Sequence, residues 1–194
     1  MTGLSDSFQR PIDYLRISVT DRCNLRCIYC MPAEGIRLLR HEDILTYEEI
    51  HRVAEAAAEL GIKKVRITGG EPLVRAGLPE LIQMLAKIAA IDDIALTTNG
   101  ILLSGYAAEL KDAGLRRVNI SLDTLKPDKF KFITRGGNLT DVLEGIQAAS
   151  DAGLNPIKIN VVVMAGINDD ELLDFANKSI DHGWHVRFLS LIHI

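Results

Sequence analysis

The chain has 194 residues, of which 47% are hydrophobic and 25% charged, a balance typical of one globular domain. Its net charge of −4 gives no sign of the basic surface that binds DNA or RNA nonspecifically. The N-terminus lacks the features of a secretory signal, and no apolar run is long enough to cross a bilayer. We therefore expect a cytoplasmic protein that binds neither nucleic acid nor membrane.

Short β-branched segments alternate with longer amphipathic segments along the whole chain. The expected strands are Leu15–Thr20, Lys64–Thr68, Ile94–Thr98, Arg117–Leu122, Ile157–Val163 and His185–Phe188. The expected helices are Tyr47–Leu60, Leu78–Ile88, Ser104–Ala113, Leu139–Ala152 and Asp169–His182. Thr46 and Glu49 have the spacing of a capping box at the start of the first helix. The alternation predicts one α/β domain with parallel strands joined by right-handed crossovers.

Both an open doubly wound sheet and a barrel satisfy this alternation. Parallel strands that are buried on both faces are usually continuous in Val, Ile and Leu, whereas these strands alternate apolar and polar residues. In the second strand, for example, Val65 and Ile67 alternate with Lys64, Arg66 and Thr68. If the apolar set faces the helices, the polar set lines a wide interior. With six repeats, the sequence predicts a partial (β/α)6 TIM-like barrel over residues 1–188.

The polar side chains of this interior are mostly cations, namely Arg16, Arg66 and Lys158, joined by Arg187. Burying several cations without partners is costly. An anionic ligand such as a phosphorylated molecule would resolve the cost. The alternative is that the cations pair with Glu71 and Asp123.

All three cysteines, Cys23, Cys27 and Cys30, lie in one C-x₃-C-x₂-C run after the first strand. A structural zinc ion takes four ligands, usually as two separated pairs, and this chain has no second pair. A four-iron cluster bound by three cysteines leaves one iron open for a substrate or cofactor. The alternatives are buried or reactive thiols, or a Cys₃His zinc site that includes His41 or His51. Free thiols fit a reducing compartment.

Three further motifs follow the next three strands, at the edge where barrel enzymes place their active sites. They are Gly69-Gly-Glu-Pro72, Thr97-Thr-Asn-Gly100 and Ser121-Leu-Asp123. Adjacent glycines allow close backbone approach, so this turn and Glu71 could hold a zwitterionic amino-acid group beside the open iron. The loops Ala33–Asp43 and Thr134–Asn138 remain unassigned, the second as either a lid or a connector.

The cysteine run, with Tyr29 before its last cysteine and with Gly69-Gly-Glu-Pro72, resembles the radical S-adenosylmethionine superfamily. The sequence around these motifs identifies a narrower family. Four segments resemble the GTP 3′,8-cyclase (MoaA) family of molybdenum cofactor biosynthesis, namely Leu15–Asp21, Val65–Leu73, Thr97–Gly100 and Val118–Asp123. The match runs from about Tyr14 to Phe188.

The resemblance implies a site residue by residue. It implies a [4Fe–4S] cluster on Cys23, Cys27 and Cys30. It implies S-adenosylmethionine contacts at Tyr29, Gly70 and Ser121. It implies GTP contacts at Arg16, Arg66, Thr97 and Lys158. The enzyme would convert GTP to 3′,8-cyclo-7,8-dihydro-GTP with an electron from a reductant and with no catalytic residue beyond the cluster and cofactor.

Two alternatives to the GTP cyclase stay open. One is a related radical enzyme that acts on a peptide or another small molecule, against which the four GTP-matching positions argue. The other is a non-catalytic iron–sulfur module with a closed site. A homodimer is compatible with the sequence.

The chain departs from the family at its C-terminal end. The family continues with three more cysteines for a second cluster, and a methionine contact after the sixth strand is missing here. Leu189–Ile194 match what a common transposon adapter end encodes, so we hypothesise a truncated gene with a non-native tail at residues 189–194. We expect the first cluster and S-adenosylmethionine to bind and GTP cyclisation to be weak or absent.

Overall fold

The computed structural model describes residues 4–190, and these form one six-stranded parallel sheet in the order β1-β2-β3-β4-β5-β6. The strands are β1 (Tyr14–Ser18), β2 (Lys64–Thr68), β3 (Asp93–Thr98), β4 (Arg117–Ser121), β5 (Lys158–Val162) and β6 (His185–Leu189). Each strand pairs with the next one along the chain. Among the described residues, β1 and β6 are the two edges, so the curved sheet is the partial (β/α)6 barrel that the sequence predicts.

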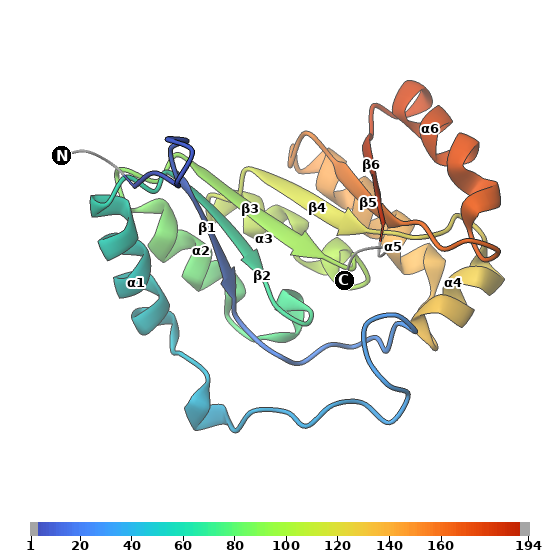
Figure 1. Cartoon of the computed structure of the whole chain (residues 1–194), viewed down its shortest axis with the longest axis horizontal. Helices are drawn as coiled ribbons and strands as arrows, with labels where there is room; N and C mark the ends of the chain where they lie inside the picture. The colour runs from blue at the N-terminus through green and yellow to red at the C-terminus, as the bar shows by residue number, and fades with distance from the viewer. Residues whose placement is uncertain (1–3, 191–194) are drawn as a thin grey trace.

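The helices cover the outer face of the sheet, as Figure 1 shows. They are α1 (Tyr47–Glu59), α2 (Leu78–Ala86), α3 (Ala107–Asp112), α4 (Pro127–Thr134), α5 (Leu139–Asp151) and α6 (Leu172–Asp181). Short 3₁₀ turns precede or connect them: η1 (His41–Asp43), η2 (Pro72–Val74), η3 (Leu103–Gly105) and η4 (Asp169–Glu171). Within residues 4–190, none of these helices has the length and apolar character needed to cross a membrane.

The hydrophobic core lies between the sheet and this helical layer. The apolar strand residues Val65, Ile67, Leu96, Ile120 and Ile159 are each at most 1% exposed. Because successive side chains of a strand point to opposite faces, the polar residues between them face the concave side. The alternation therefore gives the strands one apolar face for the helices and one polar face for the interior, as predicted.

The start of α1 matches its predicted capping box. The Thr46 hydroxyl accepts a hydrogen bond from the Glu49 N–H at 3.2 Å, and the Glu49 carboxylate accepts one from the Thr46 N–H at 2.8 Å. At the other end, Gly61 adopts a positive φ of 103° that stops the helix. Both ends of α1 are therefore set by local sequence.

Several expected elements differ from the structure by one or two residues at their ends; β1, for example, is Tyr14–Ser18 and not Leu15–Thr20. Other differences are as follows. Helix α4 was not expected, because its sequence PDKFKFIT is short and rich in aromatic and β-branched residues. The helices expected at 104–113 and 169–182 each begin with a separate 3₁₀ turn, η3 and η4. Strand β6 extends one residue beyond the expected end, to Leu189. Of the tail hypothesised to be non-native, residues 191–194 lie outside the described residues.

Candidate active site

The cysteine loop, residues 21–31, follows β1 directly. Cys23 and Cys27 are partly buried and Cys30 is exposed. The Leu25 N–H donates a hydrogen bond to the Cys23 sulfur at 3.4 Å, and the Cys30 N–H donates to the Cys27 carbonyl at 2.9 Å. Burial raises the pKa of Cys23 and raises that of Cys27 to about 12, with further increases from nearby acidic groups and the other thiols. At neutral pH these two thiols are therefore neutral unless a bound cation stabilises the thiolates.

The donor set fits a cluster better than a single metal ion. Within residues 4–190, no three His, Cys, Asp or Glu side chains lie together as ligands of one ion. His51 pairs with Glu55 at 3.4 Å, and His41 lines a separate cavity that contains none of the cysteines, so the structure does not assemble the alternative Cys₃His site. Each cysteine of a four-iron cluster binds a different iron, and its thiols need not converge. The Cys30 thiol helps to raise the pKa of Cys23, and the Cys23 and Cys30 thiols help to raise that of Cys27, so the three groups lie near one another as such a cluster requires.

The turn after β2 packs tightly against the start of the cysteine loop. The Gly70 N–H donates to the Thr20 carbonyl at 2.6 Å, and the Glu71 N–H donates to the Arg22 carbonyl at 2.8 Å. A Cβ atom at position 70 would lie 2.3 Å from that Arg22 oxygen. Glycine is therefore required here, and the close approach that it allows is to the protein's own backbone.

Gly70→Ala is expected to lower the free energy of unfolding by about 1–3 kcal/mol, because the new methyl group overlaps backbone atoms. Urea unfolding of the metal-free chain would measure the loss. Gly105→Ala is the matched control, since a Cβ atom there would meet nothing within 4 Å. Equal unfolding midpoints for the two variants would contradict the expectation.

Glu71 joins this turn to the end of β3. Its carboxylate is 1% exposed and accepts hydrogen bonds from the Thr98 hydroxyl at 2.7 Å, the Leu73 N–H at 3.1 Å and the Asn99 N–H at 2.6 Å. Burial raises the pKa of Glu71, and these three donors oppose the rise. The carboxylate is thus bound by the protein itself, and the expectation that Glu71 could also hold the amino-acid group of a ligand stays a prediction.

Side chains that follow β3 and β4 also reach the cysteine loop. The Asn99 amide donates to the Asn24 side-chain oxygen at 2.8 Å and lies 3.9 Å from the Cys23 sulfur. The Tyr29 hydroxyl donates to the Asp123 carboxylate at 2.7 Å. The four motifs that the sequence places after consecutive strands therefore meet at one rim of the barrel.

Asp123 organises the part of this rim next to β5. Besides Tyr29, its carboxylate accepts the Val162 N–H at 2.8 Å, and its carbonyl accepts the Asn168 amide at 2.7 Å. Burial raises the pKa of both Asp123 and Tyr29. Sequence reasoning missed Asn168, which is 2% exposed. Nothing distinguished it from other polar residues of its turn.

The four residues that match GTP contacts occupy neighbouring positions on the concave face. Arg16 pairs in register with Arg66 across β1 and β2. Thr97 pairs with Asn119, which in turn pairs with Lys158 across β4 and β5. Ser121, at the end of β4, lies on the same face, two residues along from Asn119. The structure thus brings the predicted GTP residues together below the cysteine rim.

The cations of this lumen repel one another and lack acidic partners at Glu71 and Asp123, which bind other groups. Burial lowers the pKa of Lys158 and of Arg66, and neighbouring arginines lower both further. Arg66 stacks on Tyr14 at 5.3 Å, and its Nε atom is buried without a hydrogen-bond partner among the described residues. This uncompensated positive charge fits an anionic ligand.

Two lumen residues were not assigned a role from the sequence. Arg117 pairs with Asp93 through two hydrogen bonds of 2.6 and 2.5 Å, and its charge acts on Lys158. Asn119 is 1% exposed, and its amide donates to the Leu96 carbonyl at 3.2 Å. Its side-chain oxygen has no partner within residues 4–190. Arg117 and Asn119 are two residues apart in β4, so the alternation of faces along the strand predicts that both face the lumen.

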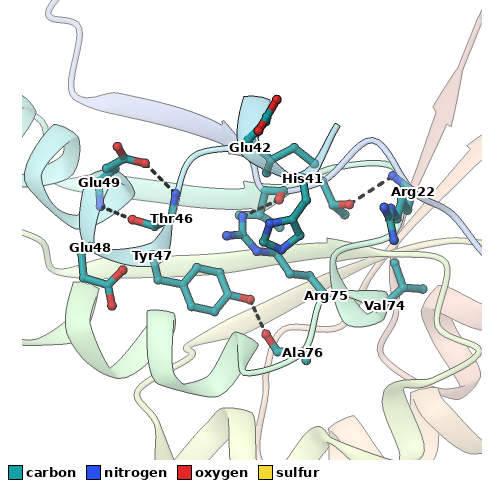
Figure 2. Close-up of a pocket in the computed structure, with 13 residues that line it drawn as sticks. Arg22, His41, Glu42, Thr46, Tyr47, Glu48, Glu49, Val74, Arg75 and Ala76 are labelled. Atoms are coloured by element: carbon teal, nitrogen blue, oxygen red, sulfur yellow. Dashed lines mark hydrogen bonds between the residues drawn. The ribbon is translucent and has the colours of Figure 1, made fainter. Parts of the chain in front are cut away.

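A separate cavity of about 530 Å³ lies beside the N-terminal end of α1 (Figure 2). The Arg75 guanidinium donates to the carbonyls of Val19 at 2.6 Å and Leu45 at 2.7 Å, and it stacks on Tyr47 at 4.2 Å. His41 lies next to Arg75 in Figure 2. None of the residues predicted to contact the cluster, S-adenosylmethionine or GTP lines this cavity. Its central arginine joins the end of β1 to the start of α1.

Sequence comparison relates the chain to proteins of known family. Residues 17–178 match the family model described as the Radical SAM superfamily. The GTP 3′,8-cyclase of Pelotomaculum thermopropionicum is 58% identical over 191 residues, which cover 98% of this chain and 59% of that protein. The GTP 3′,8-cyclase of Petrotoga mobilis is 61% identical over 184 residues, which cover 95% and 57%. The chain thus spans less than two thirds of the length of these relatives.

Solved structures agree on the fold. Streptococcus suis SuiB bound to S-adenosylmethionine superposes with a TM-score of 0.78 at 17% identity, over 94% of this chain and 41% of SuiB. Methylornithine synthase (PylB) superposes with a TM-score of 0.71 at 16% identity, over 92% of this chain and 53% of PylB. At these identities the likeness shows the fold alone. With the family model matching most of its length, the chain belongs to the radical S-adenosylmethionine superfamily.

Proposed function

We propose that this chain is the barrel part of a GTP 3′,8-cyclase, which converts GTP to 3′,8-cyclo-7,8-dihydro-GTP in the first step of molybdenum cofactor biosynthesis. The observation that carries the proposal is a lumen just below the cysteine rim that holds Arg16, Arg66, Arg117 and Lys158, of which only Arg117 has an acidic partner, Asp93, among residues 4–190. The identity of 58–61% to two GTP 3′,8-cyclases supports GTP as the anion. As a radical S-adenosylmethionine protein, the chain has a [4Fe–4S] cluster and S-adenosylmethionine as cofactors.

The rim residues have binding and orienting roles in this proposal. Cys23, Cys27 and Cys30 hold the cluster, and Tyr29, Gly70 and Ser121 contact S-adenosylmethionine. When bound, the two cofactors supply the one-electron chemistry that removes a hydrogen atom from the ribose of GTP. The hydrogen bond from Tyr29 to Asp123 fixes the aromatic ring next to the last cysteine.

The lumen residues bind the nucleotide. Arg16, Arg66 and Lys158 neutralise its phosphates, and Thr97 contacts it from the neighbouring strand. A triphosphate would relieve the repulsion that now lowers the pKa of Arg66 and Lys158. The chain's own groups therefore position GTP beneath the rim and keep its ribose near the cofactor.

The proposed partners follow from the chemistry. An external one-electron reductant is needed to reduce the cluster, and a reducing cytoplasm keeps the three thiols available. We propose no role for nucleic acid or membrane. The homodimer, the domain boundary at residue 188 and the non-native tail stay predictions.

Electron paramagnetic resonance tests the proposal. After anaerobic reconstitution and reduction, we expect a [4Fe–4S]⁺ signal that changes when S-adenosylmethionine is added, because one iron is open to it. Cys30→Ala is the control that should lack the signal. A cluster signal indifferent to S-adenosylmethionine would favour a closed iron–sulfur module. A responsive signal without any GTP binding in equilibrium dialysis would favour a relative that acts on another substrate.

A further inference from the structure

The C-terminal end of α4 lies beside the cysteine loop, as Figure 1 shows. The Arg26 N–H donates to the Thr134 carbonyl at 3.1 Å, and the Ile28 N–H donates to the Ile133 carbonyl at 2.9 Å. These carbonyls belong to the last turn of α4, where the helix leaves backbone acceptors without internal partners. Two amides on either side of Cys27 satisfy them. The loop and the helix end therefore complete each other's hydrogen bonds.

Arg135, the residue that caps α4, adds a side-chain contact to the same loop. Its Nη1 atom donates to the Arg26 carbonyl at 3.0 Å and to the Met31 carbonyl at 2.8 Å. These carbonyls lie immediately before Cys27 and immediately after Cys30. One guanidinium thus joins both ends of the segment that carries the second and third cysteines. Hydrogen bonds from a charged donor are stronger than neutral ones.

The backbone of Arg135 is itself unusual. It adopts a left-handed conformation with φ 57° and ψ 41°, which costs an L-residue roughly 1–2 kcal/mol. Within residues 4–190, Gln9 is the other non-glycine residue with positive φ. Helices usually place glycine at this capping position, and this chain has glycines at the next two positions, 136 and 137. An arginine kept in a strained position indicates a use for its side chain.

We infer that Arg135 is a positioning residue for the iron–sulfur cluster: its guanidinium and the end of α4 hold residues 26–31 in the conformation that presents Cys27 and Cys30. Arg135 contacts the backbone of the loop and not the cysteines themselves, so it would affect the cluster only by fixing where the cysteines lie. The loop at 134–138, which the sequence left as a lid or a connector, is then a connector that anchors the cluster site. This inference rests on the proposed cluster site at the three cysteines.

Hydrogen exchange in the metal-free full chain tests the inference without requiring a cluster. We expect the Arg26 and Ile28 amides to exchange about tenfold faster in Arg135→Ala, because the loop opens more often when its charged anchor is lost. Arg135→Lys should restore part of the protection. Exchange in α1 should be unchanged, and Arg52→Ala, which removes an exposed arginine of α1, is the matched control.

Three results would overturn the inference. One is exchange of the loop amides at the wild-type rate in Arg135→Ala. Another is wild-type exchange in Arg135→Gly, since glycine relieves the strain but lacks the guanidinium. If Arg135→Ala fails to fold, Arg135→Met decides, because it keeps the aliphatic stem without the donors: faster exchange supports the inference, and wild-type exchange overturns it.

The cluster itself gives a second readout. During anaerobic reconstitution we expect Arg135→Ala to take up iron and sulfide several-fold more slowly than Arg52→Ala. Equal uptake rates would limit the role of Arg135 to the metal-free loop and overturn its role toward the cluster. A third outcome separates the two proposals. If neither the wild type nor any variant takes up a cluster, but the loop amides still exchange faster in Arg135→Ala, the proposed function fails and the anchoring of the loop by Arg135 stands.

Discussion

Cys27→Ala is expected to reduce the apparent affinity for the [4Fe–4S] cluster by more than about 100-fold. Loss of a residue that only orients a ligand typically costs about 10–100-fold in metal affinity, so loss of a ligand should cost more. Cys27 is also the cysteine with the largest resolved rise in pKa, to about 12, because it is buried near Asp123. Such a thiol becomes a thiolate only when a cation binds it.

Iron and sulfide content after anaerobic reconstitution would measure the effect of Cys27→Ala. Cys27→Ser keeps the size of the side chain and is expected to lose most of the cluster as well. Glu34→Ala, a change at an exposed residue a few positions beyond the cysteines, is the matched control and should keep the wild-type iron content. A full complement of iron in Cys27→Ala would show that the cluster is held by other groups.

Lys158→Ala is expected to weaken binding of GTP by about 10–100-fold. A hydrogen bond to a charged group contributes about 1.5–3 kcal/mol, and the variant removes both this contact and one positive charge from the lumen. Isothermal titration or dialysis with GTP would measure the loss. Lys131→Ala removes the same charge from an exposed residue of α4, in the outer helical layer, and should leave the affinity unchanged. Equal losses in both variants would point to a nonspecific effect of net charge.

The same lysine predicts a pH dependence with a definite sign. Burial, followed by Arg117, Arg187 and Arg66, lowers the pKa of Lys158 below the usual 10.5. Phosphate binds the protonated form, so affinity is highest below this lowered pKa and falls as pH rises through it. The phosphate charge is constant above about pH 8, so the fall there comes from the lysine or from ionisation of the guanine base, and a Lys158→Arg variant separates the two. Lys158→Arg should bind with little pH dependence, and an equal decline in that variant would contradict this explanation.

The barrel and the position of the site could be predicted because they depend on local patterns. The alternation of Val65 and Ile67 with Lys64 and Arg66 fixes which face of β2 meets the helices, and parallel strands bring their C-terminal ends to one edge. The cysteines, Gly70 and Asp123 come directly after strands in the sequence, so their place at that edge could be predicted. Their convergence needed no knowledge of side-chain conformation.

The contacts that hold the site could not be predicted in the same way. The bond from Tyr29 to Asp123 joins residues 94 positions apart, and no periodic pattern in the sequence relates them. Helix α4 is stabilised by packing of Phe130 and Ile133, which are 2% and 1% exposed, more than by its own propensity. The internal contacts of Glu71 could not be predicted for a related reason, because they depend on three donors supplied by the fold.

Arg26 and Arg135 lie 109 positions apart in the chain, so the ribosome synthesises them at different times. Each strand pairs with the one made just before it, so the sheet can assemble as the ribosome extends the chain. The cysteine loop is an exception, because its anchor is synthesised roughly 5–20 s later. Until then its thiols are open to oxidants and to stray metal ions. We expect cluster insertion to wait for α4, and thiol labelling of nascent chains arrested before and after this helix would reveal the change.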